Sequence, residues 1–134
     1  MALLDIDSRI LLVDDFQTVR LMLRSFLREL GYRNIEEAGD GRKALMMLAD
    51  AYEADRPFHL VLSDLNMPEI TGLELLELVR QDERFKKLPF IMVTAEADRQ
   101  HVSKAMLRGV TDYIVKPFAA ATVAQKIADL MARS

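Results

Sequence analysis

Short apolar segments alternate along this chain with longer segments of helical spacing. The apolar segments lie at residues 10–13, 34–38, 58–63, 90–93 and 113–115. Apolar residues recur at helical spacing within residues 16–30, 44–51, 71–79, 98–108 and 123–131. Short apolar runs bounded by turn residues are typical of buried parallel strands. Their alternation with helices indicates βαβ units, whose right-handed crossovers permit few arrangements. The pattern therefore predicts an α/β fold with a doubly wound, five-stranded parallel sheet.

Local signals refine this prediction. The second apolar segment is weak, since Ile35 and Ala38 are its only strongly apolar residues, and this predicts a strand at the edge of the sheet. Thr71 and Glu74 have the spacing of a capping box, which predicts where the third helix begins.

Length and composition fit one domain spanning residues 1–134. The chain has 134 residues, a formal net charge of −3 and no cysteine. The charge argues against a nucleic-acid-binding surface, and the lack of cysteine excludes disulfides and thiolate metal sites. No segment approaches the roughly 20 apolar residues of a membrane span, and the first residues lack the features of a signal peptide. We therefore expect a cytoplasmic protein without nucleic-acid or membrane partners.

Chemically active side chains follow each of the four strongly apolar segments. They are Asp14 and Asp15, then Asp64, Thr94 and Lys116. The carboxyl ends of parallel strands meet at one edge of an open α/β sheet, where ligands bind. We expect these side chains to converge there, with Asp64 as the first side chain of its segment to reach solvent.

These residue types suit phosphoryl transfer. Clustered carboxylates repel one another, and a cation relieves the repulsion. An all-oxygen site suits Mg²⁺, which is held by a few carboxylates with waters and a phosphate. A carboxylate can itself become an aspartyl phosphate, while Lys116 and Thr94 would contact phosphoryl oxygens. The set indicates a phosphorylatable aspartate.

Each residue also has an ordinary structural interpretation. Taken alone, Asp15 is better explained as the cap of the first helix, and Asp14 as a solvated charge. Thr94 and Lys116 are common at strand ends, and Tyr113 is typical of half-buried packing. These interpretations do not explain why such residues follow successive strands.

Methionine and histidine residues are interpreted as structural. The methionines expected to fill the core or gaps in it are Met22, Met46, Met47, Met67, Met92 and Met106. His59 and His101 have no metal-ligating partner at useful spacing, so both are interpreted as structural or solvated.

Four motifs together resemble the receiver domains of two-component response regulators. They are Leu11-Leu12-Val13-Asp14-Asp15, Ser63-Asp64-Leu65-Asn66-Met67-Pro68 with Gly72, Val93-Thr94-Ala95, and Tyr113-Ile114-Val115-Lys116-Pro117-Phe118. Within that family, they are most similar to the CheY-like chemotaxis branch. The resemblance implies a flavodoxin-like doubly wound (βα)5 fold with strand order 2-1-3-4-5.

The resemblance implies a phosphoacceptor and a set of metal ligands. Asp64 would accept the phosphoryl group. Asp15 and Asp64 would bind Mg²⁺ directly, Asn66 would bind it through its backbone carbonyl, and Asp14 would bind it mostly through water.

The resemblance also implies a switch. Lys116, joined to Pro117 by a cis bond, would contact the phosphoryl group. Thr94 would move towards that group, and Tyr113 would turn inward. Positions that would modulate the site are Ala95, Glu96 and Pro117, with Glu96 lying over it and influencing hydrolysis.

The implied function is a stand-alone, monomeric phosphorylation switch. It would not be an enzyme beyond its own phosphorylation and aspartyl-phosphate hydrolysis. The phosphodonor would be a CheA-like histidine kinase or acetyl phosphate. The output partner would be a protein such as a flagellar motor switch protein, and a phosphatase would be a further partner. The segment 98–108 has the thinnest apolar face, so we expect it to shift. Candidate residues for the output face are Lys104, Tyr113 and Lys126.

Three features depart from the chemotaxis pattern. Leu65 stands where some members have a large aromatic residue, and we expect it to alter access to the site. Ala119 replaces a hydroxyl residue that could cap the last helix. Residues 49–56 form a longer segment that is expected to extend the second helix.

Other functions remain open. One is a phosphate shuttle or sink in another relay. Another is a haloacid-dehalogenase-like phosphatase. That family requires a second aspartate, as general acid, at the position where this chain has Asn66. A flavodoxin-like flavin binder would need a phosphate-binding Ser/Thr/Gly loop after the first strand, and the sequence lacks one there.

Overall fold

The computed structural model describes residues 5–95 and 99–132, in which strands and helices alternate. The strands are β1 (Arg9–Val13), β2 (Asn34–Ala38), β3 (Leu60–Asp64), β4 (Phe90–Ala95) and β5 (Asp112–Lys116). The helices are α1 (Gln17–Glu29), α2 (Gly41–Glu53), α3 (Gly72–Gln81), α4 (Arg99–Leu107) and α5 (Ala120–Ala132). The βαβ alternation predicted from the sequence is confirmed.

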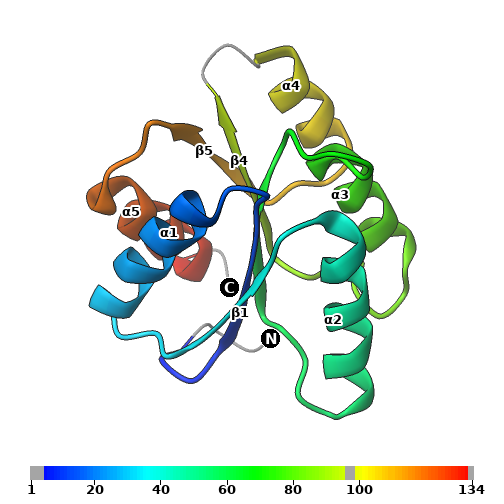
Figure 1. The fold of residues 1–134 in the computed structure, drawn as a ribbon, viewed down its shortest axis with the longest axis horizontal. Helices are drawn as coiled ribbons and strands as arrows, with labels where there is room; N and C mark the ends of the chain where they lie inside the picture. Colours follow the sequence, from blue (N-terminus) through cyan, green and yellow to red (C-terminus); the bar gives the residue numbers. More distant parts are fainter. Residues whose placement is uncertain (1–4, 96–98, 133–134) are drawn as a thin grey trace.

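The strands form one parallel sheet in the order β2-β1-β3-β4-β5 (Figure 1). This confirms the flavodoxin-like order and the edge position of β2. The direction of winding reverses between β1 and β3. Their carboxyl ends therefore border the crevice in which doubly wound sheets bind ligands.

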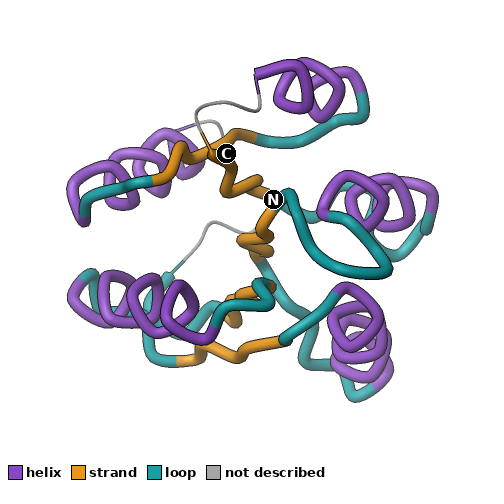
Figure 2. Tube along the Cα trace, turned by 45° about the horizontal axis from the view of Figure 1, so that its top comes forward, coloured by secondary structure: helices purple, strands orange, loops and turns teal. Residues whose placement is uncertain are grey.

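Helices cover both faces of the sheet. α1 and α5 lie on one face, and α2, α3 and α4 lie on the other (Figures 1 and 2). Alternate residues of β1 serve the two layers, because successive side chains of a strand point to opposite faces. Ile10 and Leu12 pack with α1 and α5, whereas Leu11 and Val13 pack with α2 and α3. Among the described residues, no helix is both long enough and apolar enough to cross a membrane.

Several apolar side chains in or beside the helices are exposed. Phe16 precedes α1 and is 62% exposed, and Leu30 follows the same helix. The interpretation of the methionines as core residues is wrong for Met22, Met46 and Met106, which are exposed. A surface helix buries only one stripe of side chains, and these three lie outside it. Met67 and Met92 are buried as expected.

Local signals in the sequence correctly predict the start of α3 and the extension of α2. The capping box of α3 is confirmed, with Thr71 and Glu74 exchanging hydrogen bonds of 3.0 and 3.2 Å. α2 continues through residue 53, as the longer segment 49–56 predicts, and its C-cap is Ala54. At the start of α5 the Ala119 carbonyl accepts from two backbone amides, while its methyl side chain has no acceptor to offer.

Gly72, the first residue of α3, lies against the end of β3. A Cβ atom at this position would lie 2.0 Å from the carbonyl oxygen of Asp64 and 2.8 Å from the Cα atom of Leu65. The Gly72 N–H donates to the Leu65 carbonyl at 2.8 Å. The missing side chain thus lets α3 pack directly on the backbone that carries Asp64.

We expect Gly72→Ala to lower the free energy of unfolding by about 3 kcal/mol, because backbone atoms would have to move to admit the methyl group. Urea denaturation of the variant and the unmodified protein measures this difference.

Gly39→Ala is the matched control. Its added Cβ would meet only the Arg20 side chain, at 3.8 Å, which is ordinary contact. We expect a change within about 0.5 kcal/mol there. Equal losses for the two variants would contradict the close approach assigned to Gly72.

Candidate functional site

The carboxyl ends of four strands bring the predicted site residues to one edge of the sheet. Val13 pairs with Ser63 across β1 and β3, so Asp14 and Asp64 follow at the same level. Across β4 and β5, Ala95 pairs with Lys116. The register, set by long-range pairing, therefore places these side chains together.

Asp14, Asp15 and Asp64 form a cluster of carboxylates. One oxygen from each lies within 4.8 Å of the others. Asp14 and Asp64 are only 1% and 5% exposed, whereas Asp15 is exposed. The expectations that Asp64 reaches solvent and that Asp14 is a solvated charge are therefore wrong.

The burial has a simple cause, which is that backbone pairing continues past the ends of the strands. The Asp14 N–H donates to the Ala38 carbonyl at 3.2 Å, and the Leu65 N–H donates to the Val93 carbonyl at 3.1 Å. The chain therefore leaves the sheet one residue later than the apolar pattern suggests.

Lys116 is the cation that faces this cluster. Its Nζ lies 3.0 Å from Asp64 Oδ1 and 3.5 Å from Asp14 Oδ2. The bond to Pro117 is cis, as the resemblance implies, and Pro117 is exposed. One lysine is set against three carboxylates, so the site carries an excess of negative charge.

Burial and charge shift the protonation equilibria. Burial raises the pKa of Asp14, and the charge of Asp64 adds to it, although the Phe16 N–H and Lys116 act in the opposite direction. Burial also raises the pKa of Asp64, against hydrogen bonds from Lys116 and the Asn66 N–H. Burial alone would lower the pKa of Lys116, but its two carboxylate partners outweigh burial and raise it.

The structure removes the capping interpretation of Asp15. The N-cap of α1 is Phe16, whose side chain cannot accept a hydrogen bond. Instead, Asp14 Oδ1 accepts a hydrogen bond from the Phe16 N–H at 2.8 Å. Short polar side chains commonly bond a backbone N–H two residues further on at such turns. The carboxylate of Asp15 belongs to the cluster with Asp14 and Asp64.

The remaining predicted residues surround this cluster. Thr94 is buried at the end of β4, where its hydroxyl donates to the Ala95 carbonyl at 3.3 Å, and Ala95 is exposed. Asn66 lies just past β3, and its N–H donates to the carboxylate of Asp64. Glu96 lies outside the described residues.

Tyr113 lies within a small cluster on β5 and α5. Its partly buried ring packs against the core on the α2–α4 side of the sheet. Lys126 Nζ lies 5.0 Å from the ring centroid and 3.0 Å from Asp112 Oδ1. Two of the three candidate output residues, Tyr113 and Lys126, are therefore in contact.

Leu65 and His59 both have defined structural surroundings. Leu65 is 2% exposed and belongs to the core between the sheet and α3. It supports the loop after Asp64 from beneath. The expectation that Leu65 alters access to the site stays a prediction. His59 is structural as interpreted, since its Nδ1 accepts from the Arg9 N–H at 3.2 Å. The side chain of His101 is not among those described.

Sequence reasoning missed contacts made by the main chain. The Phe16 amide, the Asn66 amide and the close approach of Gly72 all shape the aspartate cluster. Backbone groups leave no signature in a residue pattern, although Gly72 was visible as part of a motif.

The donor set fits a hard divalent cation. All three side chains offer carboxylate oxygens, the ligands that Mg²⁺ prefers, and one of the three is exposed and could be approached from solvent. A cation there would also offset the repulsion between two buried carboxylates. The residues present therefore fit the metal that the resemblance implies.

Comparison with known families decides what kind of protein this is. Residues 10–128 match the family described as response regulator receiver domain. The chain belongs to this family. The aspartate cluster and Lys116 lie at the carboxyl edge of a receiver domain.

Relatives with similar sequences span nearly the whole chain. The chemotaxis protein CheY-3 of Vibrio cholerae serotype O1 is 44% identical over 132 residues, which cover 98% of each protein. The chemotaxis protein CheY of Pseudomonas aeruginosa is 46% identical over 125 residues, which cover 93% of this receiver domain's chain and 97% of that protein. The predicted likeness to the CheY-like branch is confirmed.

Solved structures agree with this assignment. Vibrio cholerae CheY4 has a TM-score of 0.79 at 34% identity, covering 92% of this chain and 98% of that one. The receiver domain of a histidine kinase from Syntrophus aciditrophicus has a TM-score of 0.80 at 29% identity, covering 94% and 91%. The alternatives of a phosphate shuttle and a haloacid-dehalogenase-like phosphatase are not supported by these likenesses.

We expect Asp14→Asn to raise the melting temperature at neutral pH when no divalent cation is present. Burial raises the folded-state pKa of Asp14 above its ordinary value of 3.8, so the fold prefers the protonated carboxyl. The protonated carboxyl of Asp14 contributes stability below the ordinary pKa of 3.8, and this contribution is lost as the pH rises through the raised folded-state pKa. Thermal unfolding from about pH 8 down to about pH 4 should show the advantage of the variant shrinking towards acid.

Asp82→Asn provides a control of opposite sign. Hydrogen bonds from Arg84 lower the pKa of Asp82 below 3.8, so its contribution is present above that value and is lost in acid. The exposed pair is worth little, and we expect a small loss of stability at neutral pH. A constant advantage of Asp14→Asn at every pH would contradict the role assigned to burial.

Proposed function

We propose that this protein is a phosphorylation-controlled switch of the CheY kind. Asp64 accepts a phosphoryl group from a histidine kinase in a Mg²⁺-dependent reaction, and the phosphorylated form binds an output protein more tightly. The observation that carries the proposal is the position of Asp64, buried beside two other aspartates and 3.0 Å from the ammonium of Lys116.

Asp64 is suited to act as the nucleophile. A carboxylate oxygen would form a bond to phosphorus while the bond from phosphorus to the donor breaks and the donor leaves with its electron pair. Lys116 already touches Oδ1 of Asp64 and would move only slightly to meet a phosphoryl oxygen. The Asn66 N–H holds the carboxylate in place. Thr94, one residue past the Asp64–Val93 pairing, would add a hydroxyl donor.

The metal would be held by Asp14, Asp15 and Asp64, with the backbone carbonyl of Asn66 and water. When bound, it supplies positive charge that neutralises the phosphoryl oxygens and the clustered carboxylates. Asp14, fixed by the Phe16 N–H, would act mostly through water. Exposed Asp15 would be a direct ligand.

Asp64→Asn should abolish stable phosphorylation and leave the fold intact, because the amide removes the nucleophile at nearly the same size. Incubation with acetyl phosphate and Mg²⁺, followed by peptide mass analysis, measures this. Asp129→Asn is the control and should be phosphorylated normally, because Asp129 is a half-buried residue of α5 that accepts a hydrogen bond from Gln125. Phosphate found mainly on another residue, or uptake unchanged without Mg²⁺, would contradict the proposal.

The output face would be formed by α4, β5 and α5. Among the α4 side chains that the structure describes, Ala105 is the one that is buried, and Leu107 is 86% exposed. A helix with so few buried contacts has little to hold it in one position. Lys104 is exposed on α4, while Tyr113 and Lys126 lie together on β5 and α5.

Partners follow from the same proposal. The two chemotaxis relatives support a CheA-like histidine kinase as donor and a flagellar motor switch protein as the output partner. A phosphatase would end the signal, and Glu96, with neighbouring Ala95 and Pro117, would influence hydrolysis. The protein would act as a monomer.

Beryllofluoride, which mimics the phosphoryl group, should change the protein well beyond Asp64. We expect amide chemical shifts to move in α4, β5 and α5 as well as in the aspartate cluster, because Thr94 and Tyr113 would couple the two regions. An amide-shift map with and without beryllofluoride and Mg²⁺, followed by titration of a motor-switch peptide, measures both effects.

Asp64→Asn, treated identically, should give neither response. The switch would be overturned if the amide shifts were confined to the aspartate cluster and the peptide bound equally with and without beryllofluoride. The protein would then act as a phosphate sink.

A further inference from the structure

Asp14 is tied to its surroundings through its main chain as well as its side chain. Its N–H donates to the Ala38 carbonyl of β2. Its own carbonyl oxygen accepts a hydrogen bond from the guanidinium of Arg20. Arg20 lies in the first turn of α1, where its N–H donates to the Phe16 carbonyl at 3.3 Å. Its side chain thus folds back onto the loop between β1 and α1.

Glu37 of β2 holds Arg20 in this position. Arg20 Nε donates to Glu37 Oε1 at 2.9 Å, and the two side chains are 16% and 23% exposed. A guanidinium is planar and can donate in several fixed directions at once. Arg20 therefore bridges the carboxylate of Glu37 and the carbonyl of Asp14.

We propose that Arg20, held by Glu37, is a positioning residue for the metal-binding end of this site. The proposal rests on the function proposed above, in which the aspartate cluster binds Mg²⁺. Like charges on Asp14, Asp15 and Asp64 push the loop after β1 away from β3. The bridge from Glu37 through Arg20 to the Asp14 carbonyl holds that loop against this repulsion.

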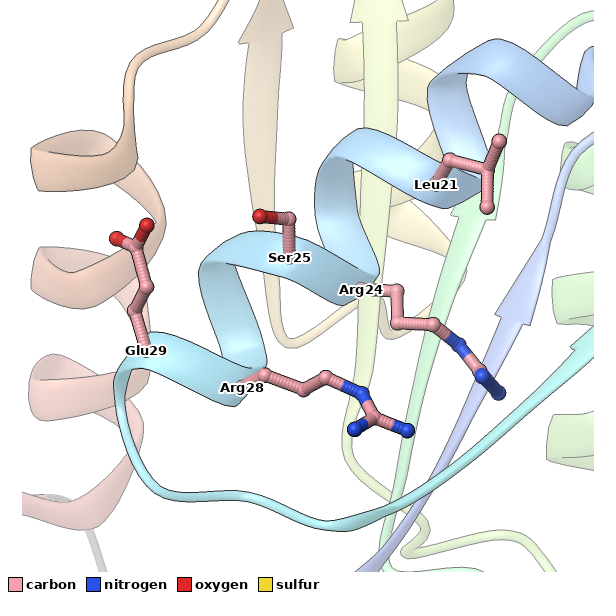
Figure 3. A pocket seen from close by; sticks show the side chains of 5 residues that line it. All are labelled: Leu21, Arg24, Ser25, Arg28 and Glu29. Carbon is pink, nitrogen blue, oxygen red and sulfur yellow. The ribbon is translucent and has the colours of Figure 1, made fainter.

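Arg24 offers a matched comparison on the same helix. Its Nε lies 3.1 Å from the other oxygen of Glu37, in a geometry that is not that of a hydrogen bond. Its guanidinium donates instead to the carbonyl of Ile35, inside β2. Figure 3 shows the Arg24 side chain running from α1 towards the strands, while Ser25 and Glu29 point the other way. Arg24 thus shares the partner of Arg20 but does not touch the aspartate loop.

The test compares Arg20→Gln, Arg20→Lys and Arg24→Gln in the full chain. The dissociation constant for Mg²⁺ is measured by titration, and hydrogen exchange of the Asp15 and Phe16 amides is measured without metal. We expect Arg20→Gln to weaken Mg²⁺ binding about tenfold and to speed exchange at both amides. Arg20→Lys should recover little, because a lysine cannot bridge two acceptors in the same way. Arg24→Gln should lower the melting temperature by about as much as Arg20→Gln does. It should change neither the dissociation constant for Mg²⁺ nor the exchange of the two amides.

The outcomes separate this inference from the proposed function. Failure of the unmodified protein to bind Mg²⁺ would overturn the metal site, while the exchange measurement would still decide whether Arg20 positions the loop. Equal Mg²⁺ binding and exchange in Arg20→Gln and the unmodified protein would overturn the inference. If Arg20→Gln and Arg24→Gln changed Mg²⁺ binding and amide exchange equally, both residues would only stabilise the fold in general, and the inference would be wrong. Glu37→Gln, which keeps Arg20 but weakens its anchor, should reproduce the loss in part and serves if Arg20→Gln does not fold.

Discussion

The repulsion among three carboxylates at one edge of the sheet is the constraint on which this structure depends. Two of them, Asp14 and Asp64, are almost completely buried, and one lysine faces them. Burying charge is costly unless it is paired, which is why the pKa of each carboxyl is raised. The fold tolerates this cost because backbone hydrogen bonds fix both residues. A site held in this way gains stability from any cation or phosphoryl group that relieves the repulsion.

The parallel sheet is what makes such a site possible. Pairing continues one residue beyond β1 and β3, so the aspartates are held by the ladder itself rather than by a mobile loop. α3 then packs on the Asp64 peptide through Gly72, and buried Leu65 fills the space beneath. Rigid elements hold reacting groups more accurately than loops do. The exposed residues at this edge include Asp15, Asn66 and Ala95, which are accessible to a ligand from solvent.

Much of the fold was predictable from the sequence because its signals are local. The apolar run of β1, the weak apolarity of β2 and the capping box at Thr71 each report on a few neighbouring residues. Strand-end chemistry predicted which residues would meet. The burial of Asp64 was not predictable, because it depends on pairing with β4, which is distant in sequence. The same applies to Asp15, whose capping interpretation fails because Asp14 satisfies the backbone amide at the start of α1.

The attachment of α4 limits how a signal could leave the site. The described contacts that tie α4 and the turn after it to α3 lie near its C-terminal end. Arg108 pairs with Glu77, and Arg80 donates to the Gly109 carbonyl at 2.8 Å. A helix fixed at one end and buried through little more than Ala105 can pivot more easily than it can slide. On the proposed mechanism, the pull on Thr94 acts at the opposite end, since β4 leads into α4. The displacement would then be largest near the start of α4 and smallest at Gly109. Tyr113 lies on the strand beside β4, paired with Met92, so the same pull reaches both sides of the proposed output face.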